Sequence, residues 1–394
     1  MVAVDPLLTI FGISVFASMI GGFSYILWIR APFESLKVSN ELNHYPKVSI
    51  IVPVRNEEKR LEATLDSLQM LDYPNFEVII VDGSSEDGTR RVAERYDKFT
   101  LINEGDLPTG WIGKVWGCWV GAQKSTGEIL LFTDADVKHS KESLKLIVNH
   151  LLSNNLEALT VLTHQEANSF WERMMFVVLF LIFIASGGSR ESKNKKSNSS
   201  IANGQYFLLT RDCYFSIDGH RAVYNNIVED IALAYKLKEN KKNFEVVAEP
   251  SIASTRMYPK GLRDMWEGWS KNLYYGSSLV RPLPRLALST IIFWSLGSPL
   301  LILMSLILGR PEMIIVGLLA FLLLVIVLIQ FSNRAGDYPW YYSFVYMIGI
   351  LFFLITLLNS YQRHKTKRGA KWRGRIYYPT LSRRSATKPS VINY

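Results

Sequence analysis

Cysteine is scarce in this chain, and neither Cys118 nor Cys213 stands at metal-ligand spacing. Two cysteines cannot form a disulfide framework, so a reduced domain that faces the cytoplasm is expected.

Basic residues are missing before Leu7. A cleaved signal peptide is therefore not expected, because its first segment would be positively charged. Acidic residues are missing from residues 361–394, which hold ten Lys or Arg.

This basic tail accounts for the charge of the whole chain, whose formal net charge is +9. A local cluster of basic residues favours contact with anionic lipid headgroups over binding of nucleic acid by the whole protein. We therefore expect a membrane as a partner and no nucleic acid. Nothing in the sequence indicates an oligomeric state.

Charge is also scarce near the N-terminus. Residues 7–28 form an almost uncharged apolar run of the length that spans a bilayer, and Arg30 follows this run. We expect residues 1–30 to be an uncleaved transmembrane anchor, with Arg30 and Lys37 on the cytoplasmic side.

Three further apolar runs near the C-terminus are each long enough to span a bilayer. They cover residues 286–308, 313–331 and 340–358. Residues 286–359 are thus expected to hold three membrane helices. Three crossings from a cytoplasmic domain would leave the basic tail outside, whereas its Lys and Arg favour the inside. The sequence does not show whether one apolar run is re-entrant or whether the tail is an exception to the rule that Lys and Arg lie inside.

Between the membrane segments, strand patterns alternate with helix patterns. Residues 48–53 and 76–81 are strand-like runs of mainly apolar residues, and amphipathic helical patterns follow them at 56–71 and 90–97. This alternation predicts an α/β fold with a mainly parallel sheet over residues 45–271. Binding sites in such sheets lie beyond the carboxyl ends of the strands.

Polar clusters follow three of these strands, at residues 53–58, 82–89 and 134–136. Three such clusters at one edge of a sheet favour a nucleotide pocket over three solvated loops. The third cluster holds Asp134 and Asp136, where an apolar strand breaks into a loop. Hard oxygen ligands of this kind suit Mg2+ or Mn2+ completed by substrate phosphates. The motif alone also fits a solvated turn.

Several stretches together resemble a known family. VSIIVPVRNEE at 48–58, VIIVDGSSEDGT at 78–89 and TDADV at 133–137 resemble family 2 glycosyltransferases of the GT-A fold. LPTGWIGKVWGCWVGA at 107–122 is similar to the membrane-bound branch that glycosylates lipids, which includes carotenoid and hopanoid-pathway enzymes and, more distantly, ceramide glucosyltransferase. The resemblance covers 48–271. It implies a GT-A nucleotide-sugar-binding domain, with transmembrane helices at the N-terminus and in the C-terminal region.

The resemblance also implies roles for residues on the donor side. Asp82 would accept a hydrogen bond from the uracil or ribose of a nucleotide sugar, and Asp134 would face the ribose or the sugar. Asp136, with Asp134, would hold the metal beside the departing diphosphate. The other expected substrate-binding residues are Pro53, Arg55, Glu57, Lys114, Trp269 and Arg263. Relatives often carry a second acid after Asp82, where this chain has Gly83.

Other readings of these side chains remain open. Lys114 is either a phosphate or sugar contact or a surface lysine. The residues Trp111, Trp116 and Trp119 are expected in the core or in a sugar-stacking wall.

An acidic pair, Glu229 and Asp230, opens a predicted helix at 231–238. An acid in the first helical turn is stabilised by the helix dipole and could take a proton from an acceptor hydroxyl. The pair could equally be an N-terminal cap. By the resemblance, Asp230 is the general base and Glu229 supports it. His220 either lines the acceptor site or is a structural loop histidine.

Residues 170–187 form an apolar segment that is short for a membrane span. If it crossed the bilayer, the acids before and after it would lie on opposite sides. We therefore expect an interfacial or re-entrant helix that docks the domain on the membrane. The polar residues 188–203 are expected to form a mobile loop.

The residues 260–271 interleave basic and aromatic side chains, as an interfacial helix does. Arg263 or Lys271 could assist the leaving diphosphate. Processive relatives carry Arg before the Trp of this region, whereas Gly268 precedes Trp269 here. Long-chain polysaccharide synthesis is accordingly disfavoured. The resemblance extends weakly to residues 372–375, which would help to close the active site and would place the tail inside.

The sequence thus predicts an inverting, metal-dependent glycosyltransferase, integral to the cell membrane, with its catalytic domain facing the cytoplasm. It would move a sugar from a nucleotide-diphosphate sugar, with UDP as the expected carrier, to a lipid hydroxyl. A polyprenyl-phosphate sugar synthase and a processive polysaccharide synthase are the alternatives. A transporter is disfavoured because the apolar runs lack ionisable residues at mid-depth. A degenerate scaffold is disfavoured because the pocket clusters keep their acids.

Overall fold

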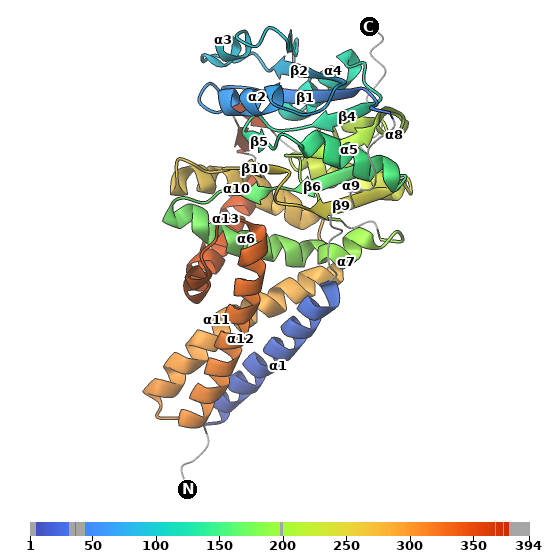
Figure 1. The fold of residues 1–394 in the computed structure, drawn as a ribbon. Coiled ribbons are helices and arrows are strands. Elements are labelled where there is room, and N and C mark those ends of the chain that lie inside the picture. Colours follow the sequence, from blue (N-terminus) through green and yellow to red (C-terminus); the bar gives the residue numbers. More distant parts are fainter. Residues whose placement is uncertain are drawn as a thin grey trace.

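A seven-stranded sheet forms the centre of the upper half of the molecule (Figure 1). The computed structural model describes residues 5–30, 36, 44–197, 200–366, 368–372 and 374–377. The expected contributions of Lys37 and of residues 378–394 lie outside these ranges. The strand order is β3-β2-β1-β4-β8-β6-β9. The strands are β1 (Val48–Val54), β2 (Phe76–Asp82), β3 (Thr100–Asn103), β4 (Ile129–Phe132), β6 (Ala158–Leu162), β8 (Phe207–Thr210) and β9 (Phe244–Ala248).

The sheet is mainly parallel, as predicted. β1 runs parallel to β2 and β4, β2 to β3, and β6 to β9, while β8 is antiparallel to both of its neighbours. The sequence of β1, VSIIVPV, is almost wholly buried, because helices cover both faces of the sheet. The carboxyl ends of β1 and β4 therefore open at the same edge, where the polar clusters follow.

Helices of the domain pack through apolar stripes on the two faces of this sheet. On α2 (Leu61–Gln69), the residues Leu61, Leu65 and Leu68 recur at helical spacing and are fully buried. Each such leucine stabilises the fold by about 1.5–3 kcal/mol. The other helices of the domain are α3 (Thr89–Ala93), α4 (Gly113–Lys124), α5 (Ser143–Ser153), α8 (Arg211–Ser216), η1 (Gly219–Val223) and α9 (Glu229–Glu239).

A small sheet lies beside the carboxyl end of β4. It has the order β5-β10-β7 and consists of β5 (Val137–His139), β10 (Ala253–Thr255) and β7 (His164–Gln165). Near the C-terminus, β11 (Ala370–Trp372) and β12 (Arg375–Tyr377) form an antiparallel hairpin. The loop between β4 and β5 is thus held between two sheets, and it carries Asp134 and Asp136.

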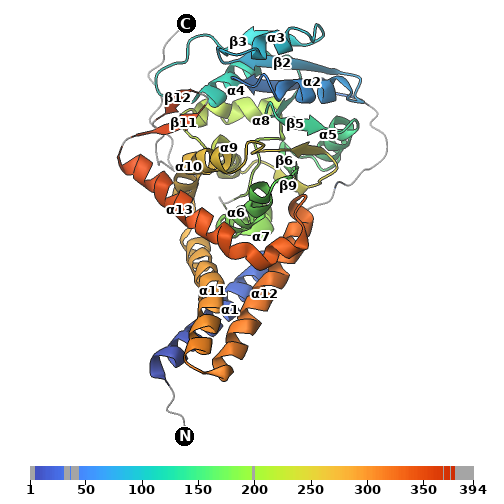
Figure 2. The ribbon, with the colours of Figure 1, turned by 90° about the vertical axis from the view of Figure 1, so that its left-hand side faces the viewer.

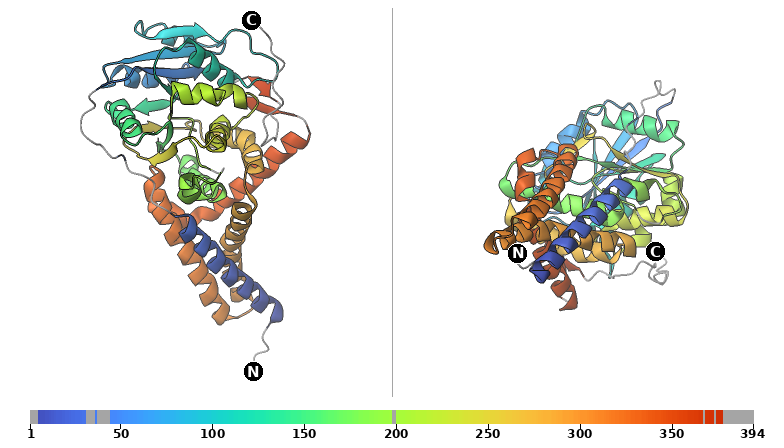
Figure 3. Two further views of the ribbon diagram at one scale, coloured as in Figure 1. Left: turned by 90° about the vertical axis from the view of Figure 1, so that its right-hand side faces the viewer. Right: turned by 90° about the horizontal axis from the view of Figure 1, so that it is seen from below.

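Long apolar helices make up the lower half of the molecule. These are α1 (Pro6–Ile29), α11 (Pro282–Ile307), α12 (Pro311–Ala335) and α13 (Tyr346–Lys365), which follows η2 (Trp340–Val345). Each of α1, α11, α12 and the η2–α13 segment is long and apolar enough to cross a membrane. Figure 1 and the left view of Figure 3 show α1, α11 and α12 extending together away from the domain. α13 instead runs obliquely across the underside of the domain (Figure 2).

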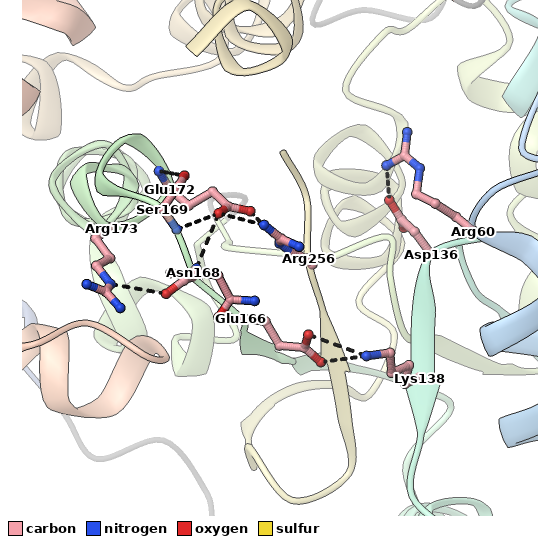
Figure 4. A network of polar contacts seen from close by, with 10 residues as sticks. Arg60, Asp136, Lys138, Glu166, Asn168, Ser169, Glu172, Arg173 and Arg256 are labelled. Atoms are coloured by element: carbon pink, nitrogen blue, oxygen red, sulfur yellow. Dashed lines mark hydrogen bonds and ion pairs between the residues drawn. The ribbon is translucent and has the colours of Figure 1, made fainter. Parts of the chain in front are cut away.

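Two further helices, α6 (Phe170–Ser186) and α10 (Leu262–Ser278), lie between the domain and the bundle of α1, α11 and α12. α6 begins with a capping box, in which Ser169 and Glu172 satisfy each other's backbone N–H groups. The carboxylate of Glu172 also pairs with Arg256, 2.7 Å away, just after β10 (Figure 4). The start of α6 is therefore fastened to the domain.

The expected loop at residues 188–203 is partly helical, and this prediction was wrong for α7 (Gly188–Lys193). Charged partners hold this short helix: the buried Lys238 Nζ donates to the Glu191 carbonyl at 2.6 Å, and the Glu191 carboxylate pairs with the exposed Arg281 at 3.2 Å. The polar composition of α7 suggested that it would be surrounded by solvent. Glu191 instead contacts Lys238 of α9 and Arg281 at the start of α11.

Candidate active site

A cavity of about 1310 Å³ connects the carboxyl edge of the main sheet with the long apolar helices. One end is lined by the carboxylates of Asp134, Asp136, Glu229 and Asp230. The other end is apolar, and its side chains come from α1, α6, α11, α12 and α13. The charged end and the apolar end thus belong to one continuous cavity. We call the apolar end, lined by α1, α6, α11, α12 and α13, the apolar sleeve.

Asp134 and Asp136 enter this cavity from the turn between β4 and β5. The turn is anchored to the main sheet, because Thr133 N donates to the Ile51 carbonyl of β1 at 3.1 Å. Asp134 Oδ1 lies 2.6 Å from Lys114 Nζ. Asp136 Oδ2 lies 2.9 Å from Arg60 Nη1, a contact that Figure 4 shows. Each acid of the motif therefore faces a cation, so negative and positive charges alternate at this end of the cavity.

Glu229 and Asp230 occupy the first turn of α9 and face the same space. Glu229 Oε1 lies 2.7 Å from Lys114 Nζ, so one ammonium bridges Asp134 and Glu229. Asp230 Oδ2 accepts a hydrogen bond from Gly204 N at 3.0 Å, just before β8. Lys114, at the start of α4, thereby links the turn after β4 to the start of α9.

The charges of this cluster shift its proton affinities in opposite directions. Burial raises the pKa of Glu229, but the Lys114 ammonium outweighs this effect and brings the pKa below its usual value. Burial and the neighbouring Glu229 carboxylate raise the pKa of Asp230 to about 6. Paired acids with separated pKa values are the arrangement expected where one stays ionised and the other exchanges a proton.

The turn after β1 supplies a wall of the cavity through Pro53, Arg55 and Glu57. Arg55 donates to the Ser84 carbonyl at 2.6 Å and pairs with Glu86 at 2.9 Å. These contacts tie the turn after β1 to the loop after β2.

Two expected substrate residues do not line the cavity. The Asp82 carboxylate is buried at the end of β2 and accepts a hydrogen bond from Ser85 N at 3.1 Å. Neighbouring Gly83 is covered by Arg375 of β12, whose Nη2 donates to its carbonyl at 3.2 Å. Asp82 is thus a loop-capping acid in this structure.

The other residue is Arg263, whose side chain is 91% exposed and faces Glu267. It does not lie where it could clamp a diphosphate. Lys271 and Trp269 of the same helix line the cavity, as do Asp264 and Glu267. The sequence pattern showed an amphipathic helix but did not show which of its faces meets the cavity.

The tryptophans and the histidine that the sequence left ambiguous lie in the core or pack against it. Trp116 Nε1 donates to the Glu104 carbonyl at 2.8 Å, and Trp119 packs against Tyr214. His220 is buried with its Nδ1 3.0 Å from Tyr214 Oη, and burial lowers the pKa of His220 to about 3. A neutral, enclosed histidine of this kind is structural.

The match to known proteins agrees with this geometry. Residues 49–215 match the family described as glycosyl transferase family 2. Over these residues the chain is a family 2 glycosyltransferase. Its relatives include 4,4'-diaponeurosporenoate glycosyltransferases from Staphylococcus haemolyticus, 28% identical over 71% of this chain and 74% of the relative, and from Staphylococcus aureus, 25% identical over 87% and 92%. These relatives are named for a carotenoid pathway.

A solved structure shares the fold of this transferase. It is a mannosyltransferase from Pyrobaculum calidifontis in complex with GDP-Man and Mn2+, with a TM-score of 0.52 and 18% identity. The similarity covers 89% of this chain and 99% of that one. The transferase therefore has the GT-A-like α/β domain that the sequence predicted, with apolar helices at the N-terminus and in the C-terminal region.

The donor set of the transferase fits a hard divalent cation. Among the described residues, no cluster of three or more His, Cys, Asp or Glu could enclose a metal by itself. Asp134 and Asp136 nevertheless offer carboxylate oxygens to the cavity. Mg2+ typically takes one or two carboxylates and completes its shell with water and substrate phosphates.

Sequence reasoning missed Arg60 of the transferase, and it gave Arg375 only as part of the segment 372–375, without naming its partner. Arg60, at the start of α2, lines the cavity and pairs with both Asp136 and Glu57. Arg375, in β12, pairs with Glu104 at 2.8 Å. Arg60 follows the polar cluster after β1 in the sequence. This position could have indicated that Arg60 lines the same pocket. The partner of Arg375 lies so far away in the sequence that no local pattern reveals the contact.

Proposed function

We propose that the transferase moves a sugar from a nucleotide-diphosphate sugar, with UDP as the expected carrier, to the hydroxyl of a membrane lipid, with inversion at the anomeric carbon. The observation that carries this proposal is the single cavity, with a cluster of carboxylates and Lys114 at one end and long apolar helices at the other. A soluble acceptor would have no use for the apolar sleeve.

On the donor side, Asp136 and Asp134 would hold Mg2+ or Mn2+. When bound, the cation supplies positive charge that neutralises the departing diphosphate. Lys114 keeps the Asp134 carboxylate oriented toward the cavity, and Arg60 does the same for Asp136. Lys271 adds a further positive charge on the acceptor side of the same cavity.

On the acceptor side, Asp230 acts as the general base. As the acceptor oxygen forms its bond to the anomeric carbon, the bond between that carbon and the diphosphate oxygen breaks. The hydroxyl proton passes to Asp230, whose raised pKa of about 6 suits proton transfer near neutral pH. Glu229, held by Lys114, stays ionised and supports the base through its charge.

The acceptor reaches this base through the apolar sleeve. Its walls include Phe23 of α1, Phe180 and Phe183 of α6, and Phe331 of α12. A lipid hydroxyl lies at the membrane interface, so its chain can remain in the sleeve while the hydroxyl meets Asp230. The four apolar helices associate the protein with a membrane, and we place the catalytic domain on its cytoplasmic side.

The test is to incubate membranes holding the full chain with a panel of labelled nucleotide sugars and Mn2+, and to analyse extracted lipids by mass spectrometry. One sugar on one lipid class is expected, with EDTA abolishing the product and Asp230→Asn lowering the rate by about 10²–10⁴. A polymer, or no lipid product from any donor, would overturn the proposal. Full activity of Asp230→Asn on a polyprenyl phosphate would favour that alternative, because a phosphate acceptor needs no base.

A second acceptor class is favoured by the relatives, whose name denotes a carboxylate. A carboxylate acceptor is already ionised, and Lys271 and Arg334 in the cavity could pair with it. Its product would be a sugar ester, which mild alkali cleaves, whereas a glycoside of a hydroxyl survives. Alkaline treatment of the extracted product therefore separates the two acceptors.

A further inference from the structure

We infer that α1, α11 and α12 cross the bilayer, while α13 lies along the membrane surface beneath the domain, in contact with lipid headgroups and the outer part of the acyl chains. By length and composition α13 could also span. The contacts along the length of α13 argue against a crossing. This inference concerns the membrane and does not depend on the proposed chemistry.

The first half of α13 packs on helices at the top of the bundle. Tyr346 Oη donates to the Ser295 carbonyl of α11 at 2.8 Å. One turn later, Gly349 lies so close to α6 that a Cβ there would be 2.6 Å from Val177 Cβ. α6 is itself fastened to the catalytic domain through Glu172 and Arg256.

The second half of α13 stays against the catalytic domain. Asn359 Nδ2 donates to Ser270 Oγ at 2.8 Å, and Tyr274 N donates to Ser360 Oγ at 3.1 Å. Both partners lie on α10, which continues into the domain where Tyr235 of α9 donates to the Leu279 carbonyl at 3.0 Å. The end of α13 is therefore next to the domain and not at the far end of the bundle.

The hairpin after α13 gives a parity argument. Arg375 pairs with Glu104 at 2.8 Å, beside β3 of the catalytic domain. The chain must therefore cross the bilayer an even number of times between the domain and Arg375. α11 and α12, joined by a short turn near Gly309, supply two crossings, and a crossing by α13 would make three. With two crossings the chain returns to the side of the catalytic domain. Three apolar runs are then compatible with a basic tail on that side.

The outward side of α13 identifies the partner. Ile348, Leu351, Ile355 and Leu358 recur at helical spacing, and their side chains are exposed. Just before them, Trp340 and other exposed aromatic residues of η2 stand where α12 ends, and such residues gather at the headgroup level. An apolar stripe that continues from a spanning helix at this level fits the bilayer boundary.

The decisive experiment maps sidedness with single cysteines and a membrane-impermeant maleimide on sealed vesicles. Cys118 and Cys213 are both buried, so the unmodified chain is the background control. Lys98→Cys marks the domain, Glu312→Cys the turn between α11 and α12, and Thr366→Cys the end of α13; all three positions are exposed. Thr366→Cys should label with Lys98→Cys, at least tenfold faster than Glu312→Cys. If it labels with Glu312→Cys, α13 crosses the bilayer and the inference fails.

A depth measurement tests the lipid contact separately. Spin labels at Leu351→Cys and Leu358→Cys should report similar depths in the bilayer, whereas a spanning helix would separate them by about 10 Å. Both labels should be accessible to lipid-dissolved oxygen. Loss of this access, together with label–label broadening between molecules, would mean that a second copy covers the stripe, and would overturn the lipid partner.

Discussion

At the scale of residues, Lys114 is the centre of the charged end of the cavity. Burial lowers the pKa of its ammonium, but Asp134 and Glu229 outweigh this and raise the pKa well above its usual value, so Lys114 stays charged. The ammonium lies within 2.7 Å of both carboxylates. Without it, two acids would face each other across the turn after β4 and the start of α9.

Replacement of this ammonium should therefore cost both stability and activity. Lys114→Gln leaves two carboxylates without their cation, which we expect to destabilise the fold by about 1–3 kcal/mol. Thermal unfolding in detergent and initial rates measure the two effects. Lys124→Gln, an exposed lysine at the end of the same helix, is the matched control. Equal effects of both substitutions would contradict the bridging role.

The pH dependence should report Asp230. The base must be ionised, and its pKa is raised to about 6, so kcat/KM should fall as the pH drops through about 6. Glu229→Gln removes a negative charge that raises this pKa, so the acidic limb of the profile should move to lower pH. A profile measured for both proteins checks the sign. A limb that stays in place, or that moves to higher pH, would show that Glu229 does not tune Asp230.

At the scale of elements, α13 depends on a close approach to α6. The missing side chain of Gly349 allows this approach, since a Cβ there would meet Val177. Gly349→Ala should destabilise the protein by about 1–3 kcal/mol, because a packed interface does not accept an extra methyl group without a shift of the helices. In Gly21→Ala on α1, the new Cβ has its nearest neighbour, Thr290, at an ordinary 3.8 Å.

Thermal unfolding of the two variants in the same detergent compares these sites. Gly21→Ala should be neutral or stabilise by up to about 1 kcal/mol, because alanine restricts the unfolded chain and favours a helix. Similar losses of stability in both variants would show that the α6–α13 contact has no special role.

The elements themselves could largely be predicted from the sequence. Continuous apolar residues gave the buried strands, and strand ends followed by acids gave the position of Asp134 and Asp136. The direction of α13 could not be predicted, because composition gives the length and apolarity of a helix but its packing partners set its tilt. For the same reason the sequence left the face of α10 open: Arg263 and Lys271 belong to one amphipathic pattern, and only the fold shows that Lys271 lines the cavity.

At the scale of the whole molecule, β12 brings the C-terminal part of the chain against the first strands of the sheet. Arg375 donates to Gly83 and pairs with the buried Glu104, while Gly113 leaves room for Tyr377, whose Oη would be 2.8 Å from a Cβ there. This hairpin thus covers the edge of the sheet beside the proposed donor site.

Loss of this contact should weaken the donor site more than the chemistry. Arg375→Gln leaves the Glu104 carboxylate buried without its partner, so the hairpin should detach and the donor KM should rise several-fold more than kcat falls. Arg368→Gln, an exposed arginine just before the hairpin, is the control. Steady-state kinetics with varied nucleotide sugar measure the split. An unchanged KM in Arg375→Gln would separate the hairpin from the donor site.

The position of this hairpin also orders events during synthesis. A ribosome makes the sheet and the membrane helices before it reaches Arg375, so the nascent protein can insert and fold its domain while that edge stays open. The edge closes only when the segment that holds Arg375 has left the ribosome. A message that stops early would therefore yield a protein that is anchored and folded but has an incomplete donor pocket.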